Sequence, residues 1–225
     1  MKPITFAVAA GLLAAAGATH CFAEDPAFDI SFGVGVANNY ISRGSTQSDD
    51  KPIVDGYMEA TYGIVYAGVW ASRVDFDPDD VEIDLYGGIR PEFGKLSLDL
   101  GYARYIYDST GDLNGEFYAK GSYAFTDAFS LGGEYYFEPD ADASWVAATT
   151  EFSGLPYEIS FSGSLGSDFG TLELGEDKVA WDAGLSRSFV DDTITLDLRY
   201  YDSNMDPGRF VARLAFDTSF SALKK

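Results

Sequence analysis

The residues that could do chemistry are few in type. The one histidine and the one cysteine, His20 and Cys21, stand side by side near the start of the chain. A lysine at position 2, an apolar run and small residues before Ala23 predict a secretory signal peptide, residues 1–23. A lipoprotein that carries its lipid on Cys21 is the alternative. Cleavage after Ala23 would leave no thiol or imidazole for a nucleophile, a zinc site or a catalytic triad.

Carboxylates are the remaining candidates for chemistry. Glu82 and Asp84 lie two residues apart on one face of an expected strand, where they could form an acid–base pair, but nothing marks a substrate pocket beside them. Asp75, Asp77 and Asp79 match the first ligands of an EF-hand loop, whose glycine and closing glutamate are missing. We therefore expect no enzyme, no catalytic residue, no metal site and no cofactor.

Charge and hydropathy exclude two further classes. The formal net charge of −21 at pH 7 opposes binding to nucleic acid, whose phosphates attract basic proteins. After the leader, no apolar run approaches the length of about 20 residues that a membrane-spanning helix needs. What remains is a soluble exported β protein or a closed outer-membrane barrel, whose alternating strands have low average hydropathy.

Apolar and polar residues alternate through most of the chain, which predicts strands. In the first segment Phe28, Ile30 and Phe32 share one face, and Asp29 and Ser31 share the other. We expect twelve strands, at about residues 28–37, 54–62, 66–76, 81–90, 96–103, 116–123, 129–137, 145–152, 157–165, 179–185, 194–200 and 210–216. Residues 145–152 show no clear sidedness. Arg104 falls on an apolar face, which indicates a bulge or an early strand end.

The connections and the aromatic residues favour the barrel. Longer polar segments, 41–51, 77–80, 108–115, 138–144, 166–177 and 202–208, alternate with short turns. Aromatic residues, among them Tyr40, Tyr66 and Phe76, gather near strand ends, as at the two interfaces of a membrane barrel. Residues 24–225 are therefore predicted to form one all-β domain, an antiparallel up-and-down transmembrane β-barrel of about 12 strands.

The polar face of such a barrel would line a pore. The candidate pore-lining residues are Arg73, Glu82, Asp84, Tyr86, Arg90, Glu116, Lys120, Asp182, Asp197, Arg199 and Arg213. Acids outnumber bases on the polar face as a whole, so an open lumen should favour cations. Alternatively, the charges pair across the lumen and close it. About twelve strands lie between the filled small barrels and the open large ones, so either outcome is physically reasonable.

The segment ISRGSTQSDDKP, residues 41–52, is the first of the long connections. Its single arginine, Arg43, could reach carboxylates of the lumen if the segment folds inward as a constriction loop. The alternative is a solvated arginine in a turn that contains Gly44. The sequence leaves both interpretations open.

Several motifs between residues 38 and 88 resemble the TorF family of porins, also known as the Gcw_chp family. The matching residues are Tyr40, Arg43, Gly44, Gln47, Ser48, Pro52, Tyr66, Ala67, Gly68, Val69, Trp70, Val74, Asp75, Phe76, Glu82, Asp84, Leu85, Tyr86 and Gly87. The resemblance implies a Gram-negative outer membrane and a channel role. In one respect the chain departs from it, because barrels of this kind usually end on an aromatic residue and here Phe220 is followed by SALKK.

The sequence thus predicts a porin-like channel in the bacterial outer membrane for passive diffusion of small hydrophilic solutes or ions, with a net acidic lumen. Its expected partners are outer-membrane lipids, these solutes and the barrel-assembly machinery, with no nucleic acid. The alternative is a plugged barrel that serves as a structural or surface-interaction component of the outer membrane.

Overall fold

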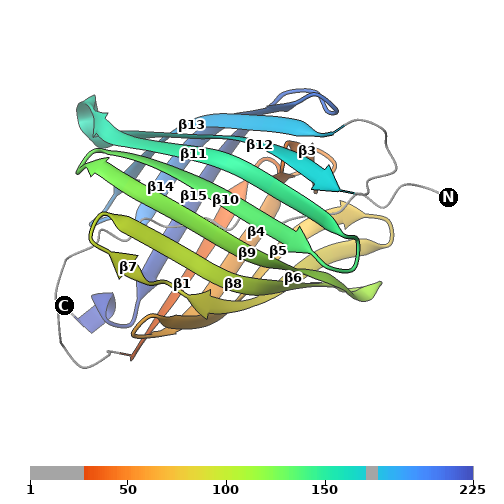
Figure 1. Ribbon diagram of the computed structural model, residues 1–225, viewed down its shortest axis with the longest axis horizontal. Coiled ribbons are helices and arrows are strands. Elements are labelled where there is room, and N and C mark those ends of the chain that lie inside the picture. Colours follow the sequence, from red (N-terminus) through yellow and green to blue (C-terminus); the bar gives the residue numbers. More distant parts are fainter. Residues whose placement is uncertain (1–27, 171–176, 225) are drawn as a thin grey trace.

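The computed structural model describes residues 28–170 and 177–224, which form a closed antiparallel β-barrel (Figure 1). The predicted signal peptide lies outside the described residues. Twelve long strands build the wall: β1 (Phe28–Ala37), β4 (Ile53–Tyr62), β5 (Val65–Phe76), β6 (Asp79–Ile89), β8 (Leu96–Tyr107), β9 (Gly111–Thr126), β10 (Phe129–Glu138), β11 (Ala143–Leu155), β12 (Ile159–Gly170), β13 (Val179–Phe189), β14 (Ile194–Ser203) and β15 (Arg209–Ser219). The predicted fold class is confirmed.

Each wall strand pairs with its neighbours in the chain, and β1 also pairs with β15, which closes the ring. The remaining elements are small: the hairpin β2 (Ile41–Ser42) and β3 (Ser45–Thr46), the short strand β7 (Glu92–Phe93) beside β8, and the single turns η1 (Pro156–Glu158) and η2 (Ala222–Lys224). Among the described residues, no helix has the length and apolar character needed to cross a membrane.

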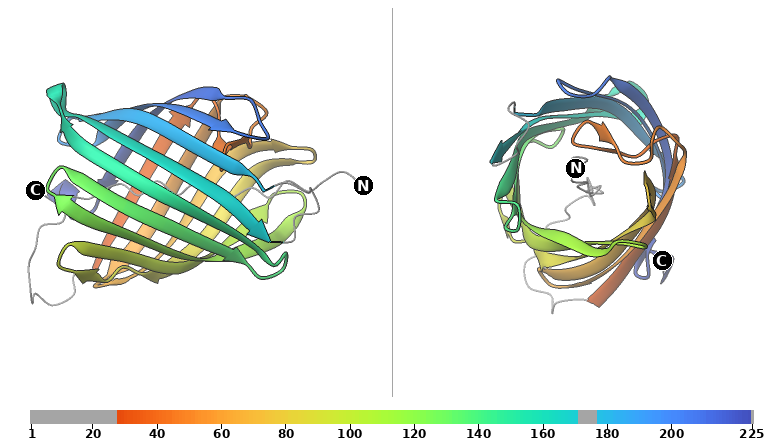
Figure 2. Two further views of the ribbon diagram at one scale, coloured as in Figure 1. Left: turned by 45° about the horizontal axis from the view of Figure 1, so that its top comes forward. Right: turned by 90° about the vertical axis from the view of Figure 1, so that its right-hand side faces the viewer.

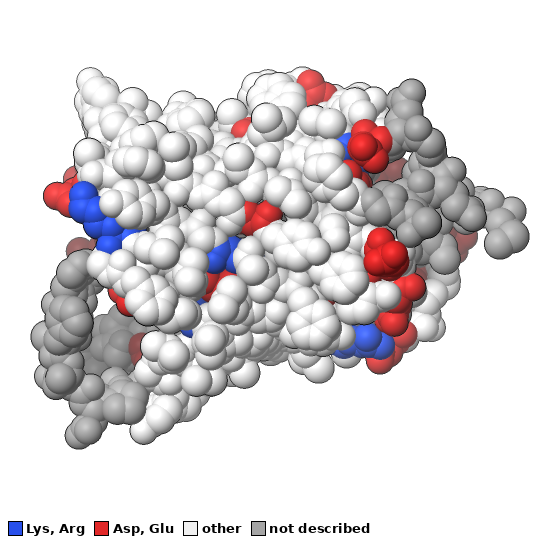
Figure 3. Space-filling model, in the orientation of Figure 1, with Lys and Arg blue, Asp and Glu red and all other residues white. Residues whose placement is uncertain are grey.

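The two faces of the wall differ in polarity because side chains alternate along each strand. Large apolar side chains such as Val36, Leu165 and Leu198 are exposed on the outer face. Charged residues such as Glu59 and Asp99 lie buried on the inner face. On the side shown in Figure 3, many Lys, Arg, Asp and Glu side chains lie toward the two ends of the barrel, and a smaller group is visible between uncharged side chains near the middle. An apolar band between charged rims fits a lipid environment.

In strand β5 the inner and outer faces are the reverse of those predicted. Asp55 pairs with Ser72, and Glu59 pairs with Gly68, so the even-numbered residues of β5 share the inner face with these carboxylates. Tyr66 and Val74 are accordingly buried, whereas Arg73 lies outside in phase with Val65 and Val69. The prediction that Arg73 lines the pore is wrong, because both faces of this strand carry large apolar residues and alternation alone could not orient it.

Other strand details also differ from expectation. Arg104 does lie on the outer face, but β8 continues to Tyr107, and the irregularity in its pairing with β9 falls between Tyr105 and Ile106. The connection expected at 108–115 is short because β9 begins at Gly111. In β11, Trp145 and Ala147 face inward and Val146 faces outward, a sidedness that the small residues around them had concealed.

Candidate functional site

The segment between β1 and β4 folds into the barrel and does not extend into solvent. In the end-on view of Figure 2 its hairpin, coloured orange, lies inside the ring of strands. Gln47 and Ser48 are 1% and 0% exposed, although both are polar. Polar side chains in a solvated loop would stay exposed, so the inward interpretation of this segment is the one that the geometry supports.

The hairpin turns at Arg43 and Gly44, where the backbone has φ values of 45° and 78°. Two successive residues with positive φ are typical of the tightest hairpin turns, and glycine favours the second position because it has no Cβ. Close packing adds a second reason, since a Cβ on Gly44 would lie 2.8 Å from Ala180 Cβ and 2.9 Å from Ser203 Cβ. This turn directs the Arg43 side chain away from β13 and β14 and across the lumen.

Arg43 forms a two-pronged ion pair with Glu116 on β9. Its Nη1 and Nη2 donate to Oε1 and Oε2 at 3.1 and 3.2 Å. The guanidinium also lies 4.9 Å from the ring centre of Tyr136 and 5.2 Å from that of Trp145. Glu116 is 3% exposed and accepts a further hydrogen bond from Tyr105 Oη at 3.0 Å. A buried, bidentate pair of this kind fixes both position and orientation.

Further contacts hold the rest of the segment. Tyr40 Oη donates to Glu82 at 3.1 Å, and Ser45 Oγ donates to Asp206 at 2.6 Å. Near the return to β4, Arg209 binds both carboxylate oxygens of Asp50 at 2.5 and 3.2 Å. The hydrogen bond from Arg209 lowers the pKa of Asp50, so this carboxylate is charged at neutral pH. These anchors along its length hold the segment in place inside the barrel.

The other predicted lining residues lie on the inner face. They are Glu82, Asp84, Tyr86, Arg90, Glu116, Lys120, Asp182, Asp197, Arg199 and Arg213. The arginines among them bind carboxylates on the same strand, on the adjacent strand or on the next strand but one. Arg90 binds Glu59 at 2.6 and 2.9 Å and Asp99 at 3.3 Å. Arg199 binds Asp182 and, at 3.1 Å, Asp197.

Sequence reasoning expected Tyr86 on the inner face but missed other inward tyrosines, among them Tyr40, Tyr66 and Tyr107. Tyr66 Oη donates to Asp99 and lies 2.5 Å from Tyr118 Oη, and Tyr107 Oη donates to Glu82 at 2.6 Å. Tyr40 and Tyr66, expected near the membrane interfaces, are 7% and 3% exposed inside the barrel. A signal was present in β8, where Tyr105 and Tyr107 are in phase with Asp99.

The inner face retains acids that no base neutralises directly. Glu82 is fully buried and receives its hydrogen bonds from the uncharged hydroxyls of Tyr40 and Tyr107. Asp84 is 3% exposed, and its Oδ1 has no hydrogen-bond partner among the described residues. In the part of the chain that the structure describes, no cluster of His, Cys, Asp or Glu is placed to hold a metal ion.

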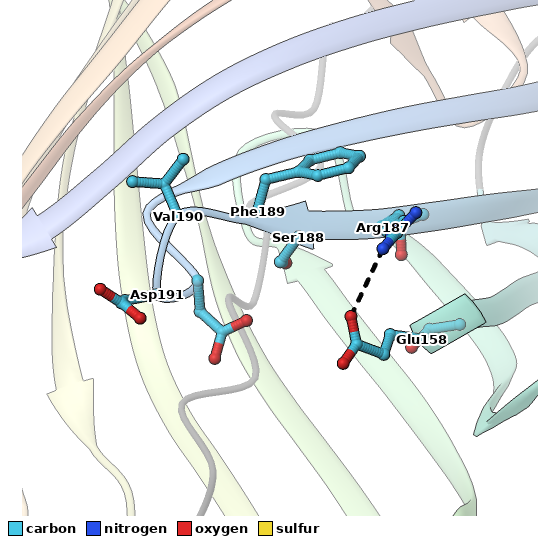
Figure 4. A pocket seen from close by; sticks show the side chains of 9 residues that line it. Glu158, Arg187, Ser188, Phe189, Val190 and Asp191 are labelled. Atoms are coloured by element: carbon cyan, nitrogen blue, oxygen red, sulfur yellow. Dashed lines mark hydrogen bonds and ion pairs between the residues drawn. The ribbon is translucent and has the colours of Figure 1, made fainter.

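A polar hollow at the opposite rim has a different character. Its volume is about 470 Å³, and Figure 4 shows it beside Glu158, Arg187 and the turn that contains Val190 and Asp191. Arg187 lies 3.5 Å from Glu158, whose side chain is 85% exposed. An exposed pair at this distance contributes little energy, so among the described residues of this hollow the ion pair is a much weaker anchor than Arg43–Glu116.

The pair Arg213–Asp55 gives a direct test of the inner network. Arg213 binds both oxygens of Asp55, at 2.5 and 3.2 Å, and the Asp55 side chain is 4% exposed. Replacing Arg213 with methionine should lower the free energy of unfolding by about 3 kcal/mol, because it leaves the buried carboxylate of Asp55 without its cation. Urea unfolding followed by tryptophan fluorescence measures this change. The double variant R213M/D55N should recover most of the loss, and a single variant as stable as the wild type would contradict the pairing.

Comparison with known proteins places the chain in a family. Residues 23–223 match the family model described as "Bacterial protein of unknown function (Gcw_chp)". The chain belongs to the Gcw_chp family. The TorF name, which the sequence motifs suggested alongside it, stays an expectation. A search of the curated proteins finds no match to this Gcw_chp protein.

Solved structures share the barrel of this Gcw_chp protein at low sequence identity. The KdgM porin superposes with a TM-score of 0.59 at 11% identity, covering 85% of this chain and 99% of that one. The NanC porin gives a TM-score of 0.54 at 10% identity, covering 85% and 98%. At this identity the similarity establishes the fold alone.

Proposed function

We propose that this Gcw_chp protein is an outer-membrane channel through which small hydrophilic solutes and ions diffuse past a fixed constriction. The observation that carries the proposal is the Arg43–Glu116 pair, which holds a polar hairpin inside a barrel with an apolar outer wall. A narrowed polar lumen in an apolar shell is the arrangement that a passive pore needs. The fold shared with the KdgM and NanC porins supports the same function.

The proposal includes a preference for cations. Glu82 and Asp84 have no basic partner among the described residues, whereas Arg90, Arg199 and Arg213 are all paired with carboxylates. Lys120 forms no ion pair among the described residues, but it lies in register with Asp99 and Glu134. Acids outnumber bases on the inner face, so this excess sets the sign of the potential in the lumen. Small anions should therefore pass less readily than small cations. We propose outer-membrane lipids and the barrel-assembly machinery as partners, and no enzymatic activity.

Solute flux into vesicles tests the channel function. The mature protein is reconstituted into liposomes, and swelling is recorded in amino acids and in sugars of increasing size. We expect rapid flux of the smallest solutes and a sharp decline with size, because the hairpin narrows the lumen. Protein that is inserted and resistant to unfolding in SDS but passes no solute would contradict the proposal. It would favour the plugged barrel, in which the arginine–carboxylate network closes the passage.

A further inference from the structure

Arg73 is an arginine on the outer wall of the barrel. Its side chain is 47% exposed and in phase with Val65 and Val69, three residues before β5 ends at the rim of the hairpin. A charged side chain facing lipid is costly near the bilayer centre and much less so at the depth of the headgroups. The position of Arg73 near the strand end places its guanidinium at that depth.

The guanidinium of Arg73 has weak partners in the protein. Its Nη1 donates to Pro52 O at 3.4 Å, and its Nη2 lies 3.9 Å from Asp75, a carboxylate that Lys51 contacts more closely. Arg104, the arginine on the outer face of β8, differs because it binds Asp112 at 2.5 Å. An arginine carries five N–H donors, so most of those on Arg73 are available to an external acceptor.

A shallow apolar groove runs along the wall next to Arg73. Its volume is about 750 Å³, and Val34, Val54, Val81, Ala71 and Gly56 line it together with Arg73 and Asp80. Ala71 and Gly56 face each other across β5 and β4, and their small size leaves the wall hollow there. Ala71 lies two residues from Arg73 in the direction of the barrel's middle, so the groove extends from the charge into the apolar band.

We propose that this surface binds a phosphorylated glycolipid of the outer leaflet, with a phosphate on Arg73 and an acyl chain in the groove. Guanidinium groups bind phosphate through paired N–H donors, and the groove supplies apolar contact below the charge. Lipid A has both parts. The inference rests on the outer-membrane location in the proposed function and on the longer connections facing the outside, as in outer-membrane barrels, but not on channel activity. Asp80 opposes the phosphate, so D80N should strengthen binding.

Lipid retention in detergent tests this site. Wild type, R73Q and the matched control R104Q are refolded with lipid A and passed through a gel-filtration column, and bound fatty acid per protein is measured across a lipid titration. We expect R73Q to bind lipid A at least tenfold more weakly, because it loses a charge-assisted hydrogen bond, and R104Q to match the wild type. A71L should also weaken binding by filling the groove.

Three results would overturn the proposal. They are equal retention by R73Q and wild type, equal retention of dephosphorylated lipid A, and a preference for phosphatidylglycerol over lipid A. Because Arg73 faces away from the lumen, R73Q should conduct ions as the wild type does. A silent channel that retains lipid A normally would therefore contradict the proposed channel function and leave the lipid site standing.

Discussion

Replacing Arg43 with methionine is expected to raise the fraction of molecules with the hairpin detached from the wall about 100-fold. The substitution keeps a long apolar side chain but leaves Glu116 buried without its cation, which costs about 3 kcal/mol, and each 1.4 kcal/mol corresponds to about a tenfold change in an equilibrium. The backbone N–H of Gln47 donates to Tyr40 O inside the barrel. Hydrogen exchange at this N–H therefore reports hairpin opening. Exchange at Gln47 should accelerate, while amides of β13 and β14 stay protected.

Two further variants make this prediction specific. R43M/E116Q removes both charges and should restore slow exchange at Gln47, because no carboxylate is left stranded. R209M breaks the pair with Asp50, whose side chain is 56% exposed, and should have a much smaller effect. Unchanged exchange in R43M with an intact barrel would show that the ion pair does not hold the hairpin.

Removing the hairpin is expected to give the largest change in transport. Ala37 and Ile53 are paired neighbours on β1 and β4, so the two-residue turn Asn-Gly can replace residues 38–52 without moving either strand. The ten residue pairs between β1 and β4 are retained, and the barrel should still fold. Glu82 and Glu116 then face an open, hydrated lumen, so sugars that the wild type excludes should enter liposomes at least severalfold faster.

The control for this deletion is a test that the barrel still folds. The deleted protein should still shift its mobility on SDS gels between unheated and boiled samples, as folded outer-membrane barrels do. A folded deletion variant with the solute cut-off of the wild type would contradict the assignment of the hairpin as the constriction.

Strand positions follow from the sequence where polarity contrasts strongly along the strand. In β14, Leu196 and Leu198 alternate with Asp197 and Arg199, and the structure places the leucines outside and the charges inside. In β5 both faces carry large apolar residues. The pairing of Ser72 with Asp55 and of Gly68 with Glu59, both on β4, decides which face of β5 points inward. A residue's own strand does not contain that information, which explains why Arg73 was placed on the wrong face.

The candidate site is harder to predict because its contacts join distant parts of the chain. Arg43 and Glu116 are 73 positions apart, and barrel closure brings them together. The two alternatives for Arg43 could be stated from the sequence, but its partner could not. The same holds for Tyr40 with Glu82. Tyrosine is amphipathic and suits both a membrane interface and a polar lumen, so residue type alone did not separate the two.

Single-channel recording in a planar bilayer under a potassium chloride gradient tests the central claim most directly. For a constricted lumen with unpaired acids we expect discrete conductance steps and a reversal potential with the same sign as the potassium equilibrium potential. A reversal potential set by chloride would contradict the acidic filter. Silence from demonstrably inserted protein would contradict the channel itself.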